Sequence, residues 1–285
     1  MLETKISPQT FYTSGYQSGD LDMKPLRSKR PTILISILIF CLQACTTLTA
    51  GVIATKTPLP EATKIPLSQQ VMLTSISFKE EGQSPVYTIS VQTPKIAGSD
   101  DARAQTFNKE MSDLIQSEIE YFRKNLLAQM PAVPVTTGSF FDAQYVVVLQ
   151  NRELWSLKFN FMGYADGAAH PYHYSMVFNY DLEQGRKLSL EELFVKDSNF
   201  LEVISSHCIF ELSKRDIGFY GGFEQGAQPE TGNYRNWNIT PDGLMITFDE
   251  YQVAPYAAGP QTVTIPYTEL TTIINPKGPL AVFSH

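Results

Sequence analysis

The chain has 285 residues, of which 43% are hydrophobic, 12% aromatic and 18% charged, a composition typical of a globular protein. Its 22 Lys and Arg stand against 29 Asp and Glu, a formal net charge of −7, so it lacks the basic balance typical of nucleic-acid-binding surfaces, and no nucleic acid is expected as partner. The three cysteines, Cys41, Cys45 and Cys208, are too few for a disulfide scaffold or a four-ligand zinc site.

The N-terminal part has a pattern typical of an export signal. Residues 32–42 form an apolar run behind three cationic residues, and this run is shorter than the roughly 20 residues of a spanning helix. Residues 42–45, Leu-Gln-Ala-Cys, resemble the lipobox of bacterial lipoproteins, in which the cysteine is acylated and becomes the first residue. We therefore predict a signal peptide over residues 1–44, with Met23 as an alternative start, and lipidation of Cys45. The rest of the chain is then extracytoplasmic and lipid-anchored to the bacterial cell membrane.

The part that follows the predicted cleavage site is acidic and begins with a tether. Removing residues 1–44 takes away five cationic and three acidic residues, which leaves 17 and 26 and a net charge of −9. Anionic lipid repels such a chain, so the acyl groups, and not a basic patch, must hold it to the membrane. Residues 45–68 are rich in threonine and proline without apolar periodicity, which predicts an extended linker.

The first half of the folded part is predicted to contain several strands and one long helix. Residues 72–78 and 87–91 alternate between apolar and polar side chains and predict two strands joined by a turn. Residues 99–101 offer capping oxygens, and apolar residues then recur at three- and four-residue steps as far as Leu126, which predicts the strongest helix of the chain. Three further strands are expected, over residues 145–149, 155–161 and 174–180.

The second half contains shorter elements. Ser189 and Glu192 have the spacing of a capping box. A helix is expected over residues 198–212, with Cys208 on its apolar stripe as a core residue. A hairpin over residues 237–248, a strand over 262–265 and a short helix over 267–274 follow.

Strands in runs with two interposed amphipathic helices predict an α+β fold with antiparallel sheet. The folded part is long enough for two lobes, which we place at residues 69–175 and 176–285.

Five segments of the second half form a distinctive set: residues 167–171 (GAAHP), 178–182 (FNYDL), 188–194 (LSLEELF), 242–259 (DGLMITFDEYQVAPYAAG) and 265–267 (IPY). Together they resemble the extracellular domain family of RsiV-type anti-sigma factors, catalogued as DUF3298. The stretch over residues 69–165 resembles more loosely the DUF4163-type segment that usually precedes this domain.

The resemblance implies binding of lysozyme without catalysis, and a related segment precedes the catalytic domain of some peptidoglycan deacetylases. The lipobox departs from the anti-sigma pattern, so signalling across the membrane is not expected.

One candidate site lies in the loop around the two histidines of residues 166–173. Asp166, His170 and His173 follow at four- and three-residue steps, and these residue types suit zinc. Against a metal site, Pro171 breaks the helical spacing, and in a strand the two histidines face opposite sides. The favoured interpretation is a tight loop in which His170 hydrogen-bonds to backbone or, with Tyr172, presents its ring to a partner.

The second candidate site combines two carboxylates with two tyrosines. Asp249 and Glu250 would act as acid and base only if their environments separated their pKa values, and sequence neighbours usually point apart. Tyr251 and Tyr256, in a segment rich in alanine and glycine, either fill the junction between lobes or anchor a protein ligand.

Two functions remain open from the sequence. The first is a non-catalytic binding domain for an envelope protein or a cell-wall ligand, with a cationic lysozyme-type hydrolase as the leading candidate because the chain is acidic. The alternative is a metal-dependent cell-wall hydrolase or deacetylase that uses Asp166, His170 and His173. No serine-nucleophile or nucleotide-binding motif stands in a suitable context, so we nominate no catalytic residue and expect no cofactor.

Overall fold

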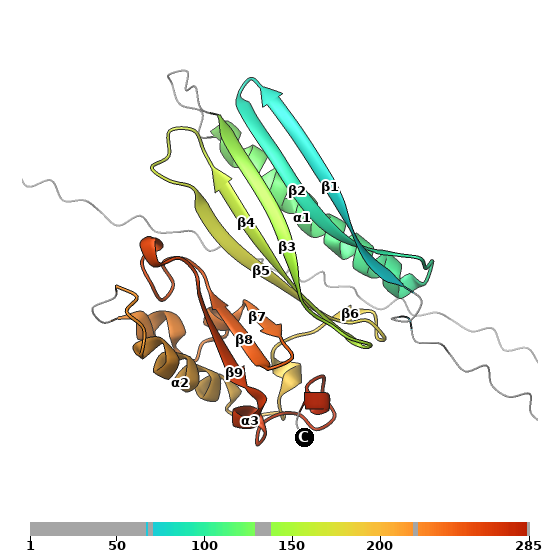
Figure 1. Ribbon diagram of the computed structural model, residues 1–285, viewed down its shortest axis with the longest axis vertical. Coiled ribbons are helices and arrows are strands. Elements are labelled where there is room, and N and C mark those ends of the chain that lie inside the picture. The colour runs from blue at the N-terminus through green and yellow to red at the C-terminus, as the bar shows by residue number, and fades with distance from the viewer. Residues whose placement is uncertain (1–66, 68–70, 129–137, 219–221, 284–285) are drawn as a thin grey trace, which may run out of the picture. The chain divides into compact units, whose positions relative to one another are not determined.

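The computed structural model describes residues 67, 71–128, 138–218 and 222–283 (Figure 1). The expected signal peptide, Cys45 and nearly all of the expected linker lie outside the described residues. Leu67, which falls in the expected linker, is completely buried. No helix within the described ranges is long and apolar enough to span a bilayer.

Six strands form the larger sheet in the order in which they occur in the chain. They are β1 (Met72–Gln83), β2 (Val86–Ala97), β3 (Ser139–Gln150), β4 (Leu154–Tyr164), β5 (Tyr172–Asp181) and β6 (Arg186–Lys187). All neighbouring pairs are antiparallel except β2 and β3, which are parallel. The sheet is therefore antiparallel, as the sequence predicted, except at this pair, where helix α1 (Ala102–Ala128) connects the two strands and allows them to run parallel.

Helix α1 covers one face of the larger sheet (Figure 1). Its buried residues recur at three- and four-residue steps, as the sequence predicted, and they are Ala104, Phe107, Met111, Ile115, Ile119 and Phe122. Phe107 meets the rings of Trp155, Phe178 and Tyr180 edge-on, with centroids 5.2–5.7 Å apart. This apolar face is the first of two cores, and the opposite face of the sheet is left for other contacts.

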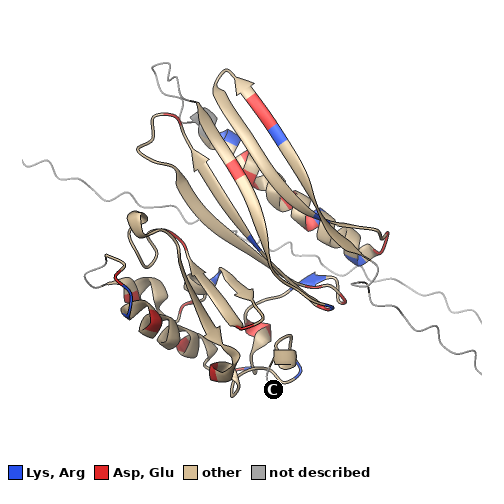
Figure 2. Ribbon diagram, in the orientation of Figure 1, with Lys and Arg blue, Asp and Glu red and all other residues tan. Residues whose placement is uncertain are grey.

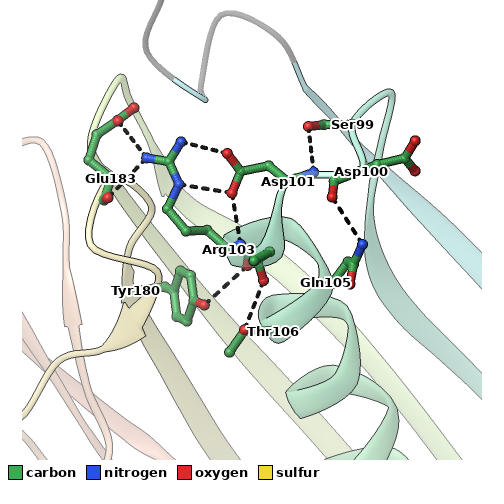
Figure 3. Close-up of polar contacts among 9 residues, drawn as sticks. Ser99, Asp100, Asp101, Arg103, Gln105, Thr106, Tyr180 and Glu183 are labelled. Atoms are coloured by element: carbon green, nitrogen blue, oxygen red, sulfur yellow. Dashed lines mark hydrogen bonds and ion pairs between the residues drawn. The ribbon is translucent and has the colours of Figure 1, made fainter. Parts of the chain in front are cut away.

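The start of α1 is tied to the turn between β5 and β6 by Arg103 (Figure 3). Asp101 caps the helix, because its Oδ1 accepts the backbone N–H of Arg103 at 2.8 Å. The guanidinium donates to both carboxylate oxygens of Asp101, at 3.0 and 2.8 Å, and to the side-chain and backbone oxygens of Glu183, at 2.9 and 3.0 Å. Gly185 has φ +66°, and a Cβ there would lie 2.6 Å from Cγ of Arg103, so this turn requires glycine.

The second core lies around a three-stranded antiparallel sheet of β7 (Trp237–Ile239), β8 (Gly243–Phe248) and β9 (Gln261–Pro266). Helix α2 (Phe200–Ser213) packs on it, and the expected core position of Cys208 is confirmed. The short elements are η2 (Glu191–Leu193), η3 (Phe223–Ala227), η4 (Thr231–Tyr234), η5 (Tyr256–Ala258), α3 (Tyr267–Leu270) and η6 (Ala281–Phe283). The expected helix over 267–274 thus ends four residues earlier.

A buried polar network joins the two sheets. Oδ1 of Asn179 on β5 accepts from Oγ of Ser156 at 2.6 Å, and Nδ2 of Asn179 donates to the carbonyl of Trp237 at 2.7 Å. Asn238 donates to Ser156 Oγ at 2.8 Å and to the carbonyl of Leu157 at 3.0 Å. The expected α+β class is confirmed, and the boundary drawn at residues 175 and 176 lies inside the continuous strand β5.

Candidate functional site

Four rings from two distant loops meet beside the larger sheet, and we call them the ring cluster: His170, His173, Tyr251 and Tyr256. The β4–β5 connection and the start of β5 supply the histidines, and the β8–β9 connection supplies the tyrosines. The ring centroids of His170 and Tyr256 are 4.0 Å apart, those of Tyr251 and Tyr256 5.9 Å, and those of His173 and Tyr256 6.2 Å. The two candidate sites of the sequence are therefore parts of one site.

Hydrogen bonds to backbone hold these rings in place. Oη of Tyr256 donates to the carbonyl of Pro171 at 3.0 Å, and Nδ1 of His170 lies 2.7 Å from the same oxygen. Nε2 of His170 is 3.4 Å from Oη of Tyr251. One nitrogen of His170 thus contacts backbone, as one of the two expectations had it, and its ring lies against the tyrosines of the same chain.

Tyr251 is an exposed member of the ring cluster and has an unusual backbone conformation. Its φ is +64°, and 62% of its surface is exposed. A left-handed conformation costs a residue with a β-carbon about 1–2 kcal/mol, and here the turn is closed by the bond from its N–H to the carbonyl of Ala254 at 3.0 Å. Strain of this kind in a non-glycine residue is concentrated at functional sites.

The two adjacent carboxylates contact different partners. Asp249 is buried and accepts the backbone N–H of Ser175 at 2.9 Å, Nδ2 of Asn236 at 2.9 Å and the guanidinium of Arg235 at 3.2 Å. Glu250 lies 3.0 Å from Nδ1 of His173, and only 8% of its side chain is exposed. Asp249 therefore fastens the β8–β9 connection to β5, and the two carboxylates do not share partners as an acid–base pair would.

A pocket of about 610 Å³ adjoins the ring cluster on the face of the sheet opposite α1. Its lining includes Asp142 and Gln144 of β3, Asn160 of β4, and His173 with Glu250. Burial raises the pKa of Asp142, and within the described part of the chain no cation or hydrogen-bond donor contacts its carboxylate. The pocket therefore offers an uncompensated carboxylate to a ligand.

The remaining sequence candidates lie elsewhere. Asp166 accepts the N–H of Gly138 at 3.2 Å and donates its own N–H to Oγ of Ser139 at 3.0 Å, so it fastens the loop to the start of β3. Tyr172 stacks on Tyr174 at 6.2 Å, and burial followed by the nearby Tyr121 raises its pKa to about 12. Among the described residues, no group of three His, Cys, Asp or Glu side chains is arranged to hold a metal ion.

Sequence reasoning missed the contribution of Asp142, Asn160 and Arg235. Strand β3 begins at Ser139, and the alternation of its side chains places Asp142 on the face away from the core. The strand that we predicted there began only at residue 145. Arg235 is a single charge in an irregular segment, and only the fold brings it to Asp249.

Part of this chain is similar to a known protein family. Residues 191–268 match the family described as "Protein of unknown function (DUF3298)", which confirms that part of the resemblance. The matched stretch contains Glu250, Tyr251 and Tyr256. It begins at residue 191 and therefore does not include His170 and His173.

Two solved structures share the fold. A DUF3298 family member from Bacteroides fragilis superposes with a TM-score of 0.57 at 17% identity, covering 75% of this chain and 97% of that chain. A DUF3298 family protein from Pseudomonas aeruginosa gives a TM-score of 0.52 at 15% identity, covering 72% and 95%. At these identities the similarity concerns the fold alone.

Three relatives share part of the sequence. The peptidoglycan-N-acetylmuramic acid deacetylase PdaC of Bacillus subtilis is 27% identical over 161 residues, 56% of this chain and 34% of that protein. An esterase of Mycobacterium tuberculosis is 28% identical over 104 residues, 35% of this chain and 44% of that protein. The immunogenic protein MPT64 of the same species is 27% identical over 112 residues, 38% of this chain and 47% of that protein. The chain thus spans less than half the length of these relatives.

Proposed function

We propose that this protein is an extracytoplasmic, lipid-anchored binding domain that is not itself catalytic, and that the ring cluster with its adjoining pocket is its ligand site. The observation that carries the proposal is the convergence of rings from two loops on Tyr256, with the strained, exposed Tyr251 among them. Tyrosine rings held rigidly at a surface are effective anchors for a protein ligand, because they bury a large area at little entropic cost.

The charge of the site favours a cationic ligand. Asp142 lacks a partner among the described residues, and the Glu250 carboxylate has only His173 beside it. A lysine or arginine side chain would compensate these carboxylates, and the net charge of −9 expected for the chain after cleavage would steer a cationic protein towards the site.

A lysozyme-type hydrolase is our leading candidate for this ligand. Such enzymes are cationic, and the resemblance to the RsiV-type extracellular family implies the same partner. One relative is named for its action on peptidoglycan, which supports a role at the cell wall. We also propose that residues 69–165 correspond to the DUF4163-type segment.

Binding by the full chain in detergent tests the ligand. A cationic lysozyme should bind at micromolar concentration, and salt should weaken the complex because it screens exposed charges. Replacing Tyr251 and Tyr256 together by alanine should reduce affinity by about thirtyfold, the roughly 2 kcal/mol of a binding hot spot. Tyr121→Ala is the matched control, because Tyr121 is an exposed tyrosine on α1. Absence of salt-sensitive micromolar binding would refute lysozyme as the ligand.

The membrane anchor has its own test. Mass spectrometry of the protein isolated from its native membrane should find Cys45 as the first residue, with a diacylglyceryl group on its thiol. An uncleaved leader with an unmodified Cys45 would refute both the anchor and the extracytoplasmic location.

The geometry gives the enzymatic alternative no support of its own. Asp166 hydrogen-bonds to the start of β3 while His170 and His173 belong to the ring cluster. These three side chains are not assembled as one ligand set in the described part of the chain.

A further inference from the structure

A second pocket lies at the open edge of β5, apart from the ring cluster. Strand β6 pairs only with Tyr180 and Asp181, so the rest of β5 has no neighbouring strand on this side in the described part of the chain. The pocket measures about 590 Å³ and lies between α1 on one side and the segment before β7 on the other. Nothing in the proposed ligand site requires this pocket.

The hydrogen bonds of β5 identify one residue with an unused backbone at this edge. The N–H of Ser175 donates to Asp249 at 2.9 Å, and the carbonyl of Asn179 accepts from the N–H of Leu188 at 2.8 Å, so odd-numbered residues direct their backbone groups outwards. Val177 lies between them and belongs to the same series. Within the described residues, neither its N–H nor its carbonyl has a partner on the open side.

The free N–H and carbonyl of one residue at a strand edge can form two hydrogen bonds with the carbonyl and N–H of one residue of an extended peptide. In an antiparallel pair, two opposite residues exchange both hydrogen bonds, and peptide recognition by strand addition uses this exchange. The ligand that fits Val177 is therefore a peptide backbone.

The residues that line the pocket determine which side chains fit on either side of the peptide residue that pairs with Val177. Leu114, Met176 and Phe178 form an apolar floor on the side of α1, where Glu110 and Asp113 are also found. Residues before and after the pairing residue direct their side chains to this side, because side chains alternate along a strand.

The pairing residue itself faces the other wall. Its side chain points the same way as that of Val177, towards Arg235 and Asn236. This is the side on which Asn179 contacts β7. An acidic side chain at this position would meet the guanidinium of Arg235, whose surface is largely exposed.

Glu110 is the carboxylate of this pocket that lacks an ion pair among the described residues, and the pocket's Lys187 lies over the ring of Phe178, with its Nζ 5.5 Å from the ring centroid. Burial raises the pKa of its carboxyl, while nearby Lys187 opposes that rise and Asp113 adds to it. Among the described residues no cation lies within ion-pair distance of Glu110, whereas Asp113 pairs with Lys109. A basic side chain of the ligand would supply the missing partner.

We propose that the pocket between α1 and the edge of β5 binds an extended segment of a partner protein with the pattern basic–acidic–apolar, whose acidic residue pairs its backbone with Val177. The basic residue lies against Glu110 and Asp113, and the apolar residue lies on Leu114 and Met176. This surface is distinct from the ring cluster and takes a different ligand chemistry.

The probe for this proposal is the blocked pentapeptide acetyl-Gly-Lys-Glu-Leu-Gly-amide, titrated into the full chain in detergent. With selective ¹⁵N labelling of valine, the Val177 amide signal should shift on binding, and its loss in Val177→Ala assigns it. An ester analogue that lacks the N–H of the central residue should bind about threefold to tenfold more weakly, the effect of one hydrogen bond. The reversed-charge peptide acetyl-Gly-Glu-Lys-Leu-Gly-amide should bind more weakly than the probe.

Two variants of the protein test the backbone bond of Val177 and the charge contact of Glu110. Val177→Pro removes the outward N–H, which an edge strand tolerates, and should bind the probe about threefold to tenfold more weakly than Val177→Ala. Glu110→Gln should also weaken binding, and alanine at Tyr251 and Tyr256 should leave it unchanged.

The peptide comparison on the unaltered chain decides the question even if Val177→Pro does not fold. An unmoved Val177 signal at millimolar probe, or equal binding of the ester and the amide, would overturn the proposal. Because the ring cluster is untouched, this failure is distinguishable from failure to bind lysozyme.

Discussion

Asn179 offers the sharpest test of how the two sheets are held together. Its side chain is buried, accepts from Oγ of Ser156 at 2.6 Å and donates to the carbonyl of Trp237 at 2.7 Å. Asn179→Ala leaves a buried hydroxyl hydrogen and a buried carbonyl without these partners. Each such group costs about 1–3 kcal/mol, so the free energy of unfolding should fall by about 2–6 kcal/mol. This is a large part of the roughly 5–15 kcal/mol that stabilises a typical domain.

Urea unfolding followed by tryptophan fluorescence measures this loss. The two tryptophans report on both cores, because Trp155 belongs to the core under α1 and Trp237 to the core around β7–β9. The midpoint should move to lower urea with an unchanged slope, since the buried area stays nearly the same.

The matched control is Asn160→Ala, an exposed asparagine on the neighbouring strand β4, which should change stability by less than about 0.5 kcal/mol. If Asn179→Ala were as mild as this control, the network would not be holding the sheets together and the reasoning would be wrong.

Three further outcomes follow from particular residues. Tyr251→Gly should raise the free energy of unfolding by up to about 1 kcal/mol, because glycine relieves the strain of the positive φ. Calorimetry measures this gain, and a destabilised variant would contradict the strain. The same variant should bind lysozyme more weakly on a biosensor. Burial raises the pKa of the Cys208 thiol to about 12, so iodoacetamide at pH 8 should label Cys208, identified by peptide mass, only after unfolding in urea. Burial likewise raises the pKa of Tyr172 to about 12 from 10.0. The free energy of unfolding should therefore fall as pH rises above 10, because the unfolded chain releases this proton at lower pH than the folded chain does. Urea titrations should show a shallower fall for Tyr172→Phe than for the unaltered chain. An identical fall in the two would show that Tyr172 is not responsible.

Local pattern was sufficient to predict most of the elements. The apolar spacing of α1 and the alternation of β4 and β5 are properties of short segments, since burying one face of a helix or strand fixes the period of its apolar residues. The turn chemistry of Pro241 to Gly243 likewise predicted the hairpin of β7 and β8. Such short-range patterns can be recognised without knowing which distant residues they will contact.

Pairing between distant strands was not predictable in the same way. The parallel pairing of β2 and β3 depends on where the chain returns after α1, and a helical crossover is compatible with more than one return position. The open edge at Val177 likewise depends on how short β6 is and on the hydrogen bond that the N–H of Ser175 donates to Asp249.

The sequence by itself determined the α+β class, the amphipathic helices and the acidic charge, because these follow from composition and short-range periodicity. It also singled out both loops that form the ring cluster. Only the tertiary structure decided that they form one site, because His170 and Tyr256 are brought to 4.0 Å by the contact of two sheets. It also separated Asp166 and Tyr172 from that site, because the order of strands in space, and not spacing along the chain, decides which side chains meet.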